Sequence, residues 1–279
     1  MPIANVNHCE FYYEITGSGP DVIFVHGEDH DIELFEHQVA YFSKWFRCIT
    51  YDRRGHGKTE LTPYGYSLHN QTLDLAVLLD HLQVSRLVIV AVAMATPIAV
   101  SFALAYPERI TGLALASWYE LDGYPLMEER RRNKHPTTFA KFHMMEFEVM
   151  RDQGSQGLID LFRREGDTLL PILPVDPDVR ERVMRMIASH RPEHFIKAAE
   201  LYTSMPNLVP RLKEIMCPIL GICGADDPSP DNADLLVGAT NFEQVWIPGA
   251  RRFSMLEAPC AFNAALERFF ATCAFRSTS

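Results

Sequence analysis

Residues 86–110, RLVIVAVAMATPIAVSFALAYPERI, decide how the rest of the chain is interpreted. Leu87–Val90 is rich in β-branched residues, as in a buried strand, and alanine dominates from Met94 to Tyr106, as in a helix. The run is uncharged over about 20 residues, enough for a membrane span. Its β-branched first half and Pro97 in its second half favour a strand, a sharp turn and a helix instead. The turn falls at Ala91–Ala95.

Short apolar runs and helical patterns alternate along the rest of the chain. This alternation is typical of an α/β fold with a mostly parallel sheet covered by helices. We expect strands at Phe11–Ile15, Asp21–Val25, Arg47–Tyr51, Leu87–Val90, Gly112–Ala116, Ile219–Cys223 and Gln244–Ile247, and helices at Leu68–Leu82, Met94–Tyr106 and Cys260–Ala271.

The segment between the fifth and sixth of these strands has a different pattern. From Trp118 to Pro206 no strand is evident, and Phe139, Phe142 and Met145 recur at helical spacing. That stripe indicates packing core, and contact of one side with a ligand is the alternative. We expect a core domain of residues 1–117 and 207–279 with residues 118–206 as a helical cap.

Composition limits the classes of partner. The 279 residues are 47% hydrophobic and carry a formal net charge of −10, which disfavours binding to nucleic acid. The N-terminus has no basic start followed by an apolar stretch, so we expect a cytoplasmic protein without a membrane segment. In such a chain the 6 cysteines are expected to be reduced and buried.

Two pairs of histidines have the spacing of metal ligands on one face of a helix. His26 and His30 are four residues apart, and so are His190 and His194. Gly27 and Pro192 lie inside these two pairs and disfavour the regular helix that would align their side chains. The sequence therefore predicts no metal site and no cofactor.

Four local patterns occur in a diagnostic order. GSGPDVIFVHG ends a strand at His26-Gly27, YDRRGHGKT spans Tyr51–Thr59, the strand–turn–helix centres on Ala93, and ICGADDPSP and WIPGARRFSMLEAP follow the last two strands. Together they resemble the α/β-hydrolase superfamily, in particular its capped branch of enol-lactonases, C–C bond hydrolases and haloperoxidase-like esterases. The resemblance implies that fold, which hosts many different chemistries.

The family's catalytic residues are only partly present. Its turn has the form G-x-S-x-G, with the nucleophilic serine on a strained elbow. Here the central position is Ala93, which has no Oγ, so no ester intermediate can form there. The position of the family's histidine falls on Arg252, or on Arg251 after a shift of one residue, and neither is a base near neutral pH. Asp227 matches the acid, with Asp226 as the second choice.

Other side chains could replace the missing serine. Ser117 and Cys223 end core strands, and Thr96 lies one turn into the helix. For each, ordinary packing or a hydrogen bond to the preceding turn is the simpler interpretation. No G-x-S-x-G occurs anywhere in the chain.

The resemblance also implies an oxyanion hole made by backbone amides. One donor comes from the loop at Gly27 and the other is the N–H of Met94. That loop continues as Glu28-Asp29-His30-Asp31, so a carboxylate with a raised pKa at Glu28, or the imidazole of His30, could transfer protons. The alternative is a set of exposed loop charges, with Asp31 capping the next helix.

Three further positions have two interpretations each. Arg252 either forms a buried ion pair with Asp227 or binds a substrate carboxylate. Trp118 and Tyr119 either stack on a flat ligand or pack in the core. His26, Arg54, Gly55 and Gly57, which belong to the family-like motifs, are expected to be architectural.

Three functions follow, in order of preference. The first is a cofactor-independent enzyme with an atypical catalytic triad, a lyase, isomerase, decarboxylase or water-activating hydrolase, in which Glu28 or His30 moves protons and Arg252 orients a small carbonyl or carboxylate substrate. The second is an inactive relative that binds a small molecule, such as a carboxylate or an aromatic carbonyl. The third is a conventional serine hydrolase with a different alignment. Because capped relatives are often dimers, a homodimer is a further expectation.

Overall fold

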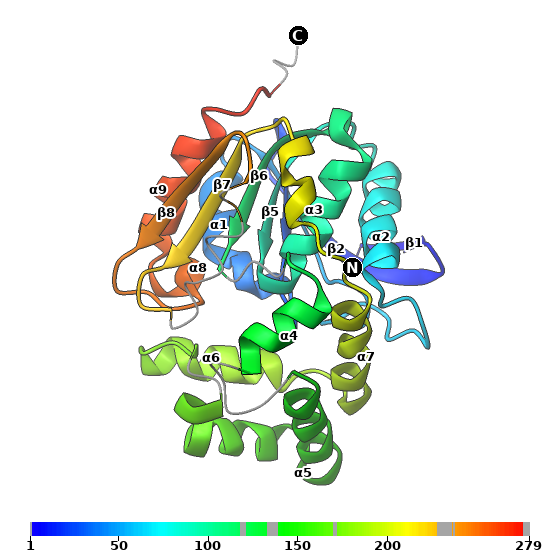
Figure 1. Ribbon diagram of the computed structural model, residues 1–279, viewed down its shortest axis with the longest axis vertical. Helices are drawn as coiled ribbons and strands as arrows, with labels where there is room; N and C mark the ends of the chain where they lie inside the picture. Colours follow the sequence, from blue (N-terminus) through cyan, green and yellow to red (C-terminus); the bar gives the residue numbers. More distant parts are fainter. Residues whose placement is uncertain are drawn as a thin grey trace.

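The computed structural model describes residues 2–117, 121–132, 139–169, 172–227, 236 and 238–275. An eight-stranded sheet with strand order β1-β2-β4-β3-β5-β6-β7-β8 forms its centre (Figure 1). The strands are β1 (Ile3–Val6), β2 (Cys9–Thr16), β3 (Asp21–Val25), β4 (Arg47–Tyr51), β5 (Leu87–Val92), β6 (Ile110–Ala116), β7 (Ile219–Gly224) and β8 (Phe242–Ile247). Strands β3 to β8 run parallel to one another, whereas β2 pairs antiparallel with β1 and β4.

The seven strands predicted from the sequence are confirmed, and β1 was missed. β1 is a four-residue edge strand, Ile3–Val6, whose Ile3 side chain is exposed. It is too short to show a clear alternation of polar and apolar residues. The expected mostly parallel α/β sheet is therefore correct, with one additional antiparallel hairpin at its edge.

Strand β5 lies in the middle of the sheet and is buried along its whole length. Its side chains alternate between two hydrophobic clusters, with Ile89 on one face of the sheet and Val88 and Val90 on the other. Burial on both faces explains why its sequence is continuously apolar. Burial of β5 and of most of α3 also explains why residues 87–106 form an uncharged run as long as a membrane span.

Helices cover both faces of the sheet (Figure 1). The α-helices are α1 (Glu36–Phe42), α2 (Leu68–His81), α3 (Thr96–Ala105), α4 (Tyr124–Arg132), α5 (Phe139–Leu169), α6 (Pro177–Ile187), α7 (Pro192–Thr203), α8 (Ser254–Glu257) and α9 (Pro259–Phe270), and the 3-10 helices are η1 (Ile32–Phe35), η2 (Ala93–Ala95), η3 (Pro107–Arg109) and η4 (Val209–Glu214). The predicted helices correspond to α2, to η2 with α3, and to α9. Apolar residues of α2 and α3 join one cluster, and those of α1 and α9 join the other.

Helices α4, α5, α6 and α7 lie together beyond one end of the sheet (Figure 1). The chain enters them after the carboxyl end of β6, so they lie on the side where the parallel strands end. Phe142 is buried and Met145 is partly buried in one of the hydrophobic clusters, which confirms the packing interpretation for these two residues. The side chain of Phe139 lies outside the described part of the structure. The division into core and cap domains stays a prediction.

No helix in the described ranges is long and apolar enough to cross a bilayer. All six cysteines are free thiols, as expected, and four of them are buried. The framework is therefore held by its core without covalent links between these residues.

Candidate functional site

The carboxyl ends of the parallel strands bring the predicted site residues to one edge of the sheet. His26 and Gly27 follow β3, Ala93 follows β5, Asp227 follows β7 and Arg252 follows β8. In open parallel sheets this edge is where ligands bind. The topology therefore assembles residues that are up to 226 positions apart, from His26 to Arg252.

Ala93 has the backbone conformation of a strained elbow. Its φ is +49°, a left-handed value that residues other than glycine rarely adopt and that costs about 1–3 kcal/mol. Gly27 lies directly against it, because a Cβ on Gly27 would come within 3.2 Å of the Ala93 Cβ and 3.1 Å of the Val92 carbonyl oxygen. Glycine at position 27 thus lets the loop after β3 approach the elbow.

His30 lies beside the same point. Its Nδ1 is 3.1 Å from the position where a Cβ on Gly27 would be, and its ring meets the Phe253 ring edge-on at 5.2 Å. Burial, with the neighbouring His190 acting in the same direction, lowers the pKa of His30 to about 3, so the imidazole is neutral at physiological pH. Among the described residues Nδ1 has no hydrogen-bond partner.

Glu28 is buried in a cluster of charged and aromatic groups. Arg53 Nη2 donates to its Oε2 at 3.0 Å, and its Oε1 lies 2.8 Å from His56 Nε2 and 3.6 Å from His194 Nε2. Burial alone raises the pKa of Glu28, but Arg53 and His56 outweigh it and hold that pKa well below its usual range. The raised pKa expected from the sequence is therefore wrong.

The alternative of exposed loop charges is also wrong for most of this loop. Glu28, Asp29 and His30 are all buried. Asp31 does cap the following 3-10 helix, since its Oδ1 accepts a hydrogen bond from the Glu33 N–H at 2.8 Å. Three of the four residues of this loop are therefore buried, and only its last residue, Asp31, has the expected capping role.

Arg252 pairs with Asp227. Its Nε donates to Asp227 Oδ2 at 3.1 Å and its Nη2 to Oδ1 at 3.4 Å, and both side chains are buried. Asp226 is exposed, and Arg251 Nη1 donates to the Leu173 carbonyl, so the preferred alignment of Asp227 with Arg252 agrees with the geometry. This contact is the buried ion pair that was one of the two interpretations of Arg252.

The hydroxyl and thiol groups near the site have packing partners, with one exception. Ser117 Oγ donates to the Arg252 carbonyl, and Cys223 Sγ donates to the Ser117 carbonyl. Thr96 was expected to bond the preceding turn, but among the described residues its fully buried Oγ1 has no partner. Trp118 and Tyr119 lie outside the described residues.

His56, His194, His190 and Asp29 belong to this site and were not identified from the sequence. His194 Nε2 lies 2.9 Å from Asp29 Oδ1, and its ring stacks on His190 with centroids 4.3 Å apart. The sequence pairing of His190 with His194 was rejected because of Pro192. That proline begins α7, and His194 reaches the loops after β3 and β4 from its first turn.

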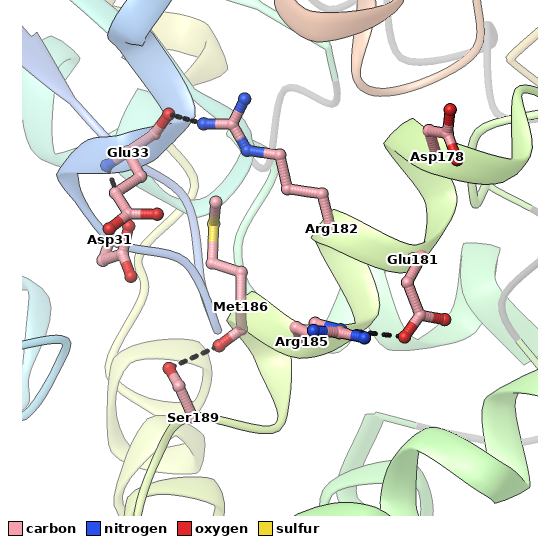
Figure 2. A pocket seen from close by; sticks show the side chains of 8 residues that line it. All are labelled: Asp31, Glu33, Asp178, Glu181, Arg182, Arg185, Met186 and Ser189. Atoms are coloured by element: carbon pink, nitrogen blue, oxygen red, sulfur yellow. Dashed lines mark hydrogen bonds and ion pairs between the residues drawn. The ribbon is translucent and has the colours of Figure 1, made fainter.

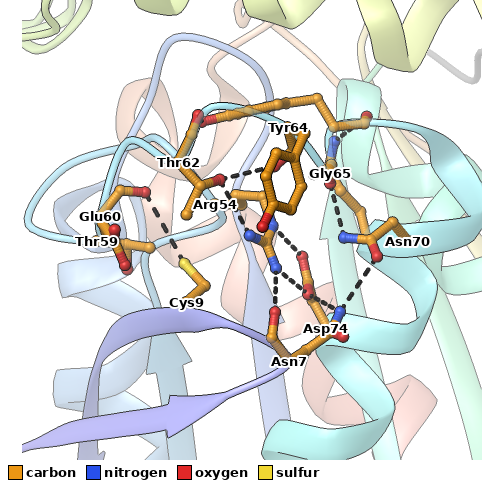
Figure 3. A network of polar contacts seen from close by, with 12 residues as sticks. Asn7, Cys9, Arg54, Thr59, Glu60, Thr62, Tyr64, Gly65, Asn70 and Asp74 are labelled. Atoms are coloured by element: carbon orange, nitrogen blue, oxygen red, sulfur yellow. Dashed lines mark hydrogen bonds and ion pairs between the residues drawn. The ribbon is translucent and has the colours of Figure 1, made fainter.

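Arg54 and its partners form a separate network, shown in Figure 3. Arg54 Nε and Nη2 donate to the two carboxylate oxygens of Asp74, Nη1 donates to Thr62 Oγ1, and Nη2 also donates to the Asn7 carbonyl. His26 is likewise fully used: its Nδ1 donates to the Gly27 carbonyl and its Nε2 accepts the Arg53 N–H. These contacts tie loops together, as expected of architectural residues.

Away from these residues, a surface hollow lies between the loop before η1 and helix α6, and Figure 2 shows the residues that line it. Its volume is about 430 Å³. Arg182 donates to the Glu33 carbonyl and Arg185 to Glu181, so these charges are compensated within the protein. None of the predicted site residues is among the described residues that line this hollow; Asp31, which was expected to cap a helix, is one of them.

Comparisons with known proteins agree with this fold. A family model described as the α/β hydrolase fold matches residues 20–146. The 3-oxoadipate enol-lactonase 2 of Acinetobacter baylyi is 26% identical over 251 residues, covering 89% of this chain and 87% of that protein.

Solved structures show the same fold. The enol-lactonase from Burkholderia xenovorans LB400 superposes with a TM-score of 0.79 at 24% identity, covering 97% of this chain and all of that one. A thermophilic esterase from Thermogutta terrifontis gives a TM-score of 0.77 at 25% identity, covering 96% and 95%. The chain has the α/β-hydrolase fold and is similar to enzymes of that superfamily, as its motifs predicted.

Proposed function

We propose that this chain is an enzyme that acts on a small carbonyl or carboxylate compound by proton transfer, without an acyl-enzyme intermediate. The observation that supports this most is Ala93, held at a left-handed φ of +49° beside the neutral imidazole of His30. We place this site between a core of residues 1–117 and 207–279 and a cap of residues 118–206.

The absence of a serine–histidine pair is part of the proposal. Ala93 has no hydroxyl, so the elbow offers no nucleophile. At the matching position of the last loop, Arg252 is bound to Asp227 through two nitrogens, and a guanidinium does not accept protons near neutral pH. Restoring a serine at position 93 would therefore leave it without a base.

His30 has the properties needed to assist a proton transfer. A neutral imidazole can donate a hydrogen bond from one nitrogen and accept one at the other. With a pKa of about 3 it stays neutral, and it polarises a carbonyl oxygen more readily than it removes protons by itself. Arg53 holds the pKa of Glu28 well below its usual range, so this carboxylate is ionised and would be the group that accepts the α-proton of the substrate and returns it.

The oxyanion donors would be backbone amides. In the described part of the chain, the N–H groups of Glu28 and Met94 make no backbone hydrogen bond outside their own segments. Two such donors at a developing negative oxygen stabilise an enolate by several kcal/mol, on the order of 3–4 for one donor in a typical case. An enolate also fits the name of one relative, a 3-oxoadipate enol-lactonase, which we extend to this chain only as a substrate class.

Hydrogen–deuterium exchange tests this proposal. A panel of 3-oxo acids, 2-oxo acids and enol-lactones is incubated with the protein in D₂O and followed by proton NMR. We expect wild type to consume at least one compound, or to exchange its α-protons, and His30→Gln to do so roughly 10²–10⁴-fold more slowly. The matched control is His37→Gln, since the His37 side chain is 42% exposed on α1.

The outcome also separates a second candidate, a non-catalytic binder of a small molecule. The buried pair of Arg252 and Asp227 favours that alternative, because it occupies two family catalytic positions with an inert contact. A compound that binds but is neither changed nor exchanged by wild type would support the binder. Equal turnover by wild type and His30→Gln would remove His30 from the mechanism.

A further inference from the structure

Three buried donor atoms from three separate segments converge beside the elbow. They are Glu28 Oε1 after β3, His56 Nε2 after β4 and His194 Nε2 in the first turn of α7, and all lie within 4.8 Å of one another. The separation is 2.8 Å from Glu28 Oε1 to His56 Nε2 and 3.6 Å to His194 Nε2. A carboxylate and two imidazoles are a common set of ligands for a zinc-like ion.

Backbone carbonyls determine the tautomers of both histidines. His56 Nδ1 lies 2.9 Å from the Arg54 carbonyl oxygen, and His194 Nδ1 lies 3.1 Å from the Gly55 carbonyl oxygen. A carbonyl oxygen only accepts hydrogen bonds, so each Nδ1 carries a proton. His56 Nε2 accepts from Arg53 Nη2 at 3.2 Å, whereas His194 Nε2 lies 2.9 Å from Asp29 Oδ1, where a proton or a cation must bridge the two atoms. Metal-bound histidines are oriented by this same contact from the ring nitrogen that does not bind the metal.

The atom facing these nitrogens is itself unsatisfied. Glu28 Oε1 is buried, and among the described residues it has no hydrogen-bond partner although His56 Nε2 is 2.8 Å away. Two lone pairs at that distance repel unless a proton or a cation lies between them. His190 Nε2 is another buried polar atom without a hydrogen-bond partner among the described residues, and the His190 ring stacks on His194.

The surrounding charges favour a cation over extra protons. Glu28 and Asp29 supply two carboxylates; Arg53 Nη2 lies 3.0 Å from Glu28 Oε2, and Asp29 Oδ1 lies 2.9 Å from His194 Nε2. Arg53 binds Glu28 Oε2 and leaves Oε1 directed at the two histidines.

We propose that Glu28, His56 and His194 bind one divalent transition-metal ion of the zinc type. In tetrahedral coordination with bonds of about 2.0–2.1 Å, ligand atoms are about 3.3 Å apart, and the separations of 2.8 and 3.6 Å from Glu28 Oε1 to the two nitrogens lie within about 0.5 Å of that value. This would replace the sequence prediction of no metal. It does not depend on the proposed proton transfer, because the cluster is defined by its own three donors.

Equilibrium dialysis of the full chain against Zn²⁺ alone, with metal counted by mass spectrometry, tests the proposal. We expect one ion per chain in wild type and in His37→Gln. His194→Gln removes a direct ligand, so its affinity should fall by more than the roughly 10–100-fold that loss of an indirect partner costs. Circular dichroism and the urea midpoint would show whether each variant is folded.

Cobalt provides a second test that does not depend on activity or on the stability of one variant. Wild type loaded with Co²⁺ should give the intense visible bands of a four-coordinate ion. His56→Cys should keep binding and add a thiolate-to-cobalt charge-transfer band. No ion retained by folded wild type, or binding that is equal in wild type and His194→Gln, would overturn the proposal while leaving the proton-transfer function untouched.

Discussion

Two consecutive arginines, Arg53 and Arg54, anchor two buried polar networks of opposite character. In the Arg54 network every side chain is satisfied, from the two-oxygen contact with Asp74 to the bond with Thr62 (Figure 3). Around Arg53 the described atoms Glu28 Oε1, His190 Nε2 and Arg53 Nε have no hydrogen-bond partner. One network holds loops together, and the other has unused bonding capacity at the strand ends.

The difference shows how structural polar clusters can be told from functional ones. A buried polar atom without a partner costs about 1–3 kcal/mol, so such atoms are rare unless a ligand, ion or proton completes them. Burial alone does not separate the two networks, since Arg53 and Arg54 are equally buried. Hydrogen-bond satisfaction does.

The largest effect is expected from breaking the satisfied network. Asp74→Ala leaves the buried Arg54 charge without its carboxylate, which should lower the free energy of unfolding by about 3–5 kcal/mol. Urea denaturation measures this, with His30→Gln as the comparison variant, expected to change stability by less. A cost below about 1 kcal/mol for Asp74→Ala would break the distinction between the networks.

The next effect is kinetic and concerns the unsatisfied side. His30→Gln should lower kcat/KM by roughly 10²-fold or more, equivalent to at least about 2.7 kcal/mol of transition-state stabilisation. Steady-state kinetics with the compound found by exchange would measure it. The comparison fails if the loss of activity is matched by an equal loss of folded protein.

Asp52 precedes Arg53, and its ionisation should make the stability of this region depend on pH. Burial raises the pKa of Asp52 to about 7, although the Lys58 and Ile32 N–H groups donate to it. Its folded pKa is above its unfolded value near 4, so its contribution to stability is present below pH 4 and is lost as pH rises through 7.

The expected slope is about 1.4 kcal/mol per pH unit across that window. The measurement is the free energy of unfolding of wild type minus that of Asp52→Asn from pH 4 to 7. Parallel pH profiles for the two proteins would show that Asp52 is already ionised when folded.

The smallest effect is at the elbow. Ala93→Gly relieves a left-handed φ but adds freedom to the unfolded chain, so the net gain should be at most about 1 kcal/mol. Ala99→Gly in α3 is the matched control and should cost about 1 kcal/mol, because that residue is helical. Equal losses in both variants would show that the elbow at Ala93 is not strained.

The sequence predicted the fold better than the site. Strands such as β5 are continuous apolar runs, and the turn residues around Ala93 lie between unmistakable strand and helix patterns, so local signals were sufficient. The pairing of Arg252 with Asp227 was one of two interpretations that the loop positions allowed, and the contact itself is visible only in the structure. The edge strand β1 was missed because four residues show too little periodicity.

The cluster of Glu28, His56 and His194 could not be predicted from spacing. Glu28 and His56 come from the loops after β3 and β4, and His194 comes from α7, so the three meet only when α7 packs against these loops. Helical spacing was therefore the wrong criterion for His190 and His194. The sign of the Glu28 pKa shift failed for the same reason, because it depends on Arg53 and His56 as neighbours in space.

The central claim is turnover without a covalent intermediate, and intact-protein mass spectrometry tests it most directly. Wild type is mixed with the compound found by exchange, quenched during turnover, and in parallel treated with a fluorophosphonate. We predict that the compound is consumed while the protein mass stays unchanged in both samples. A stoichiometric adduct on any serine, threonine or cysteine would contradict the account.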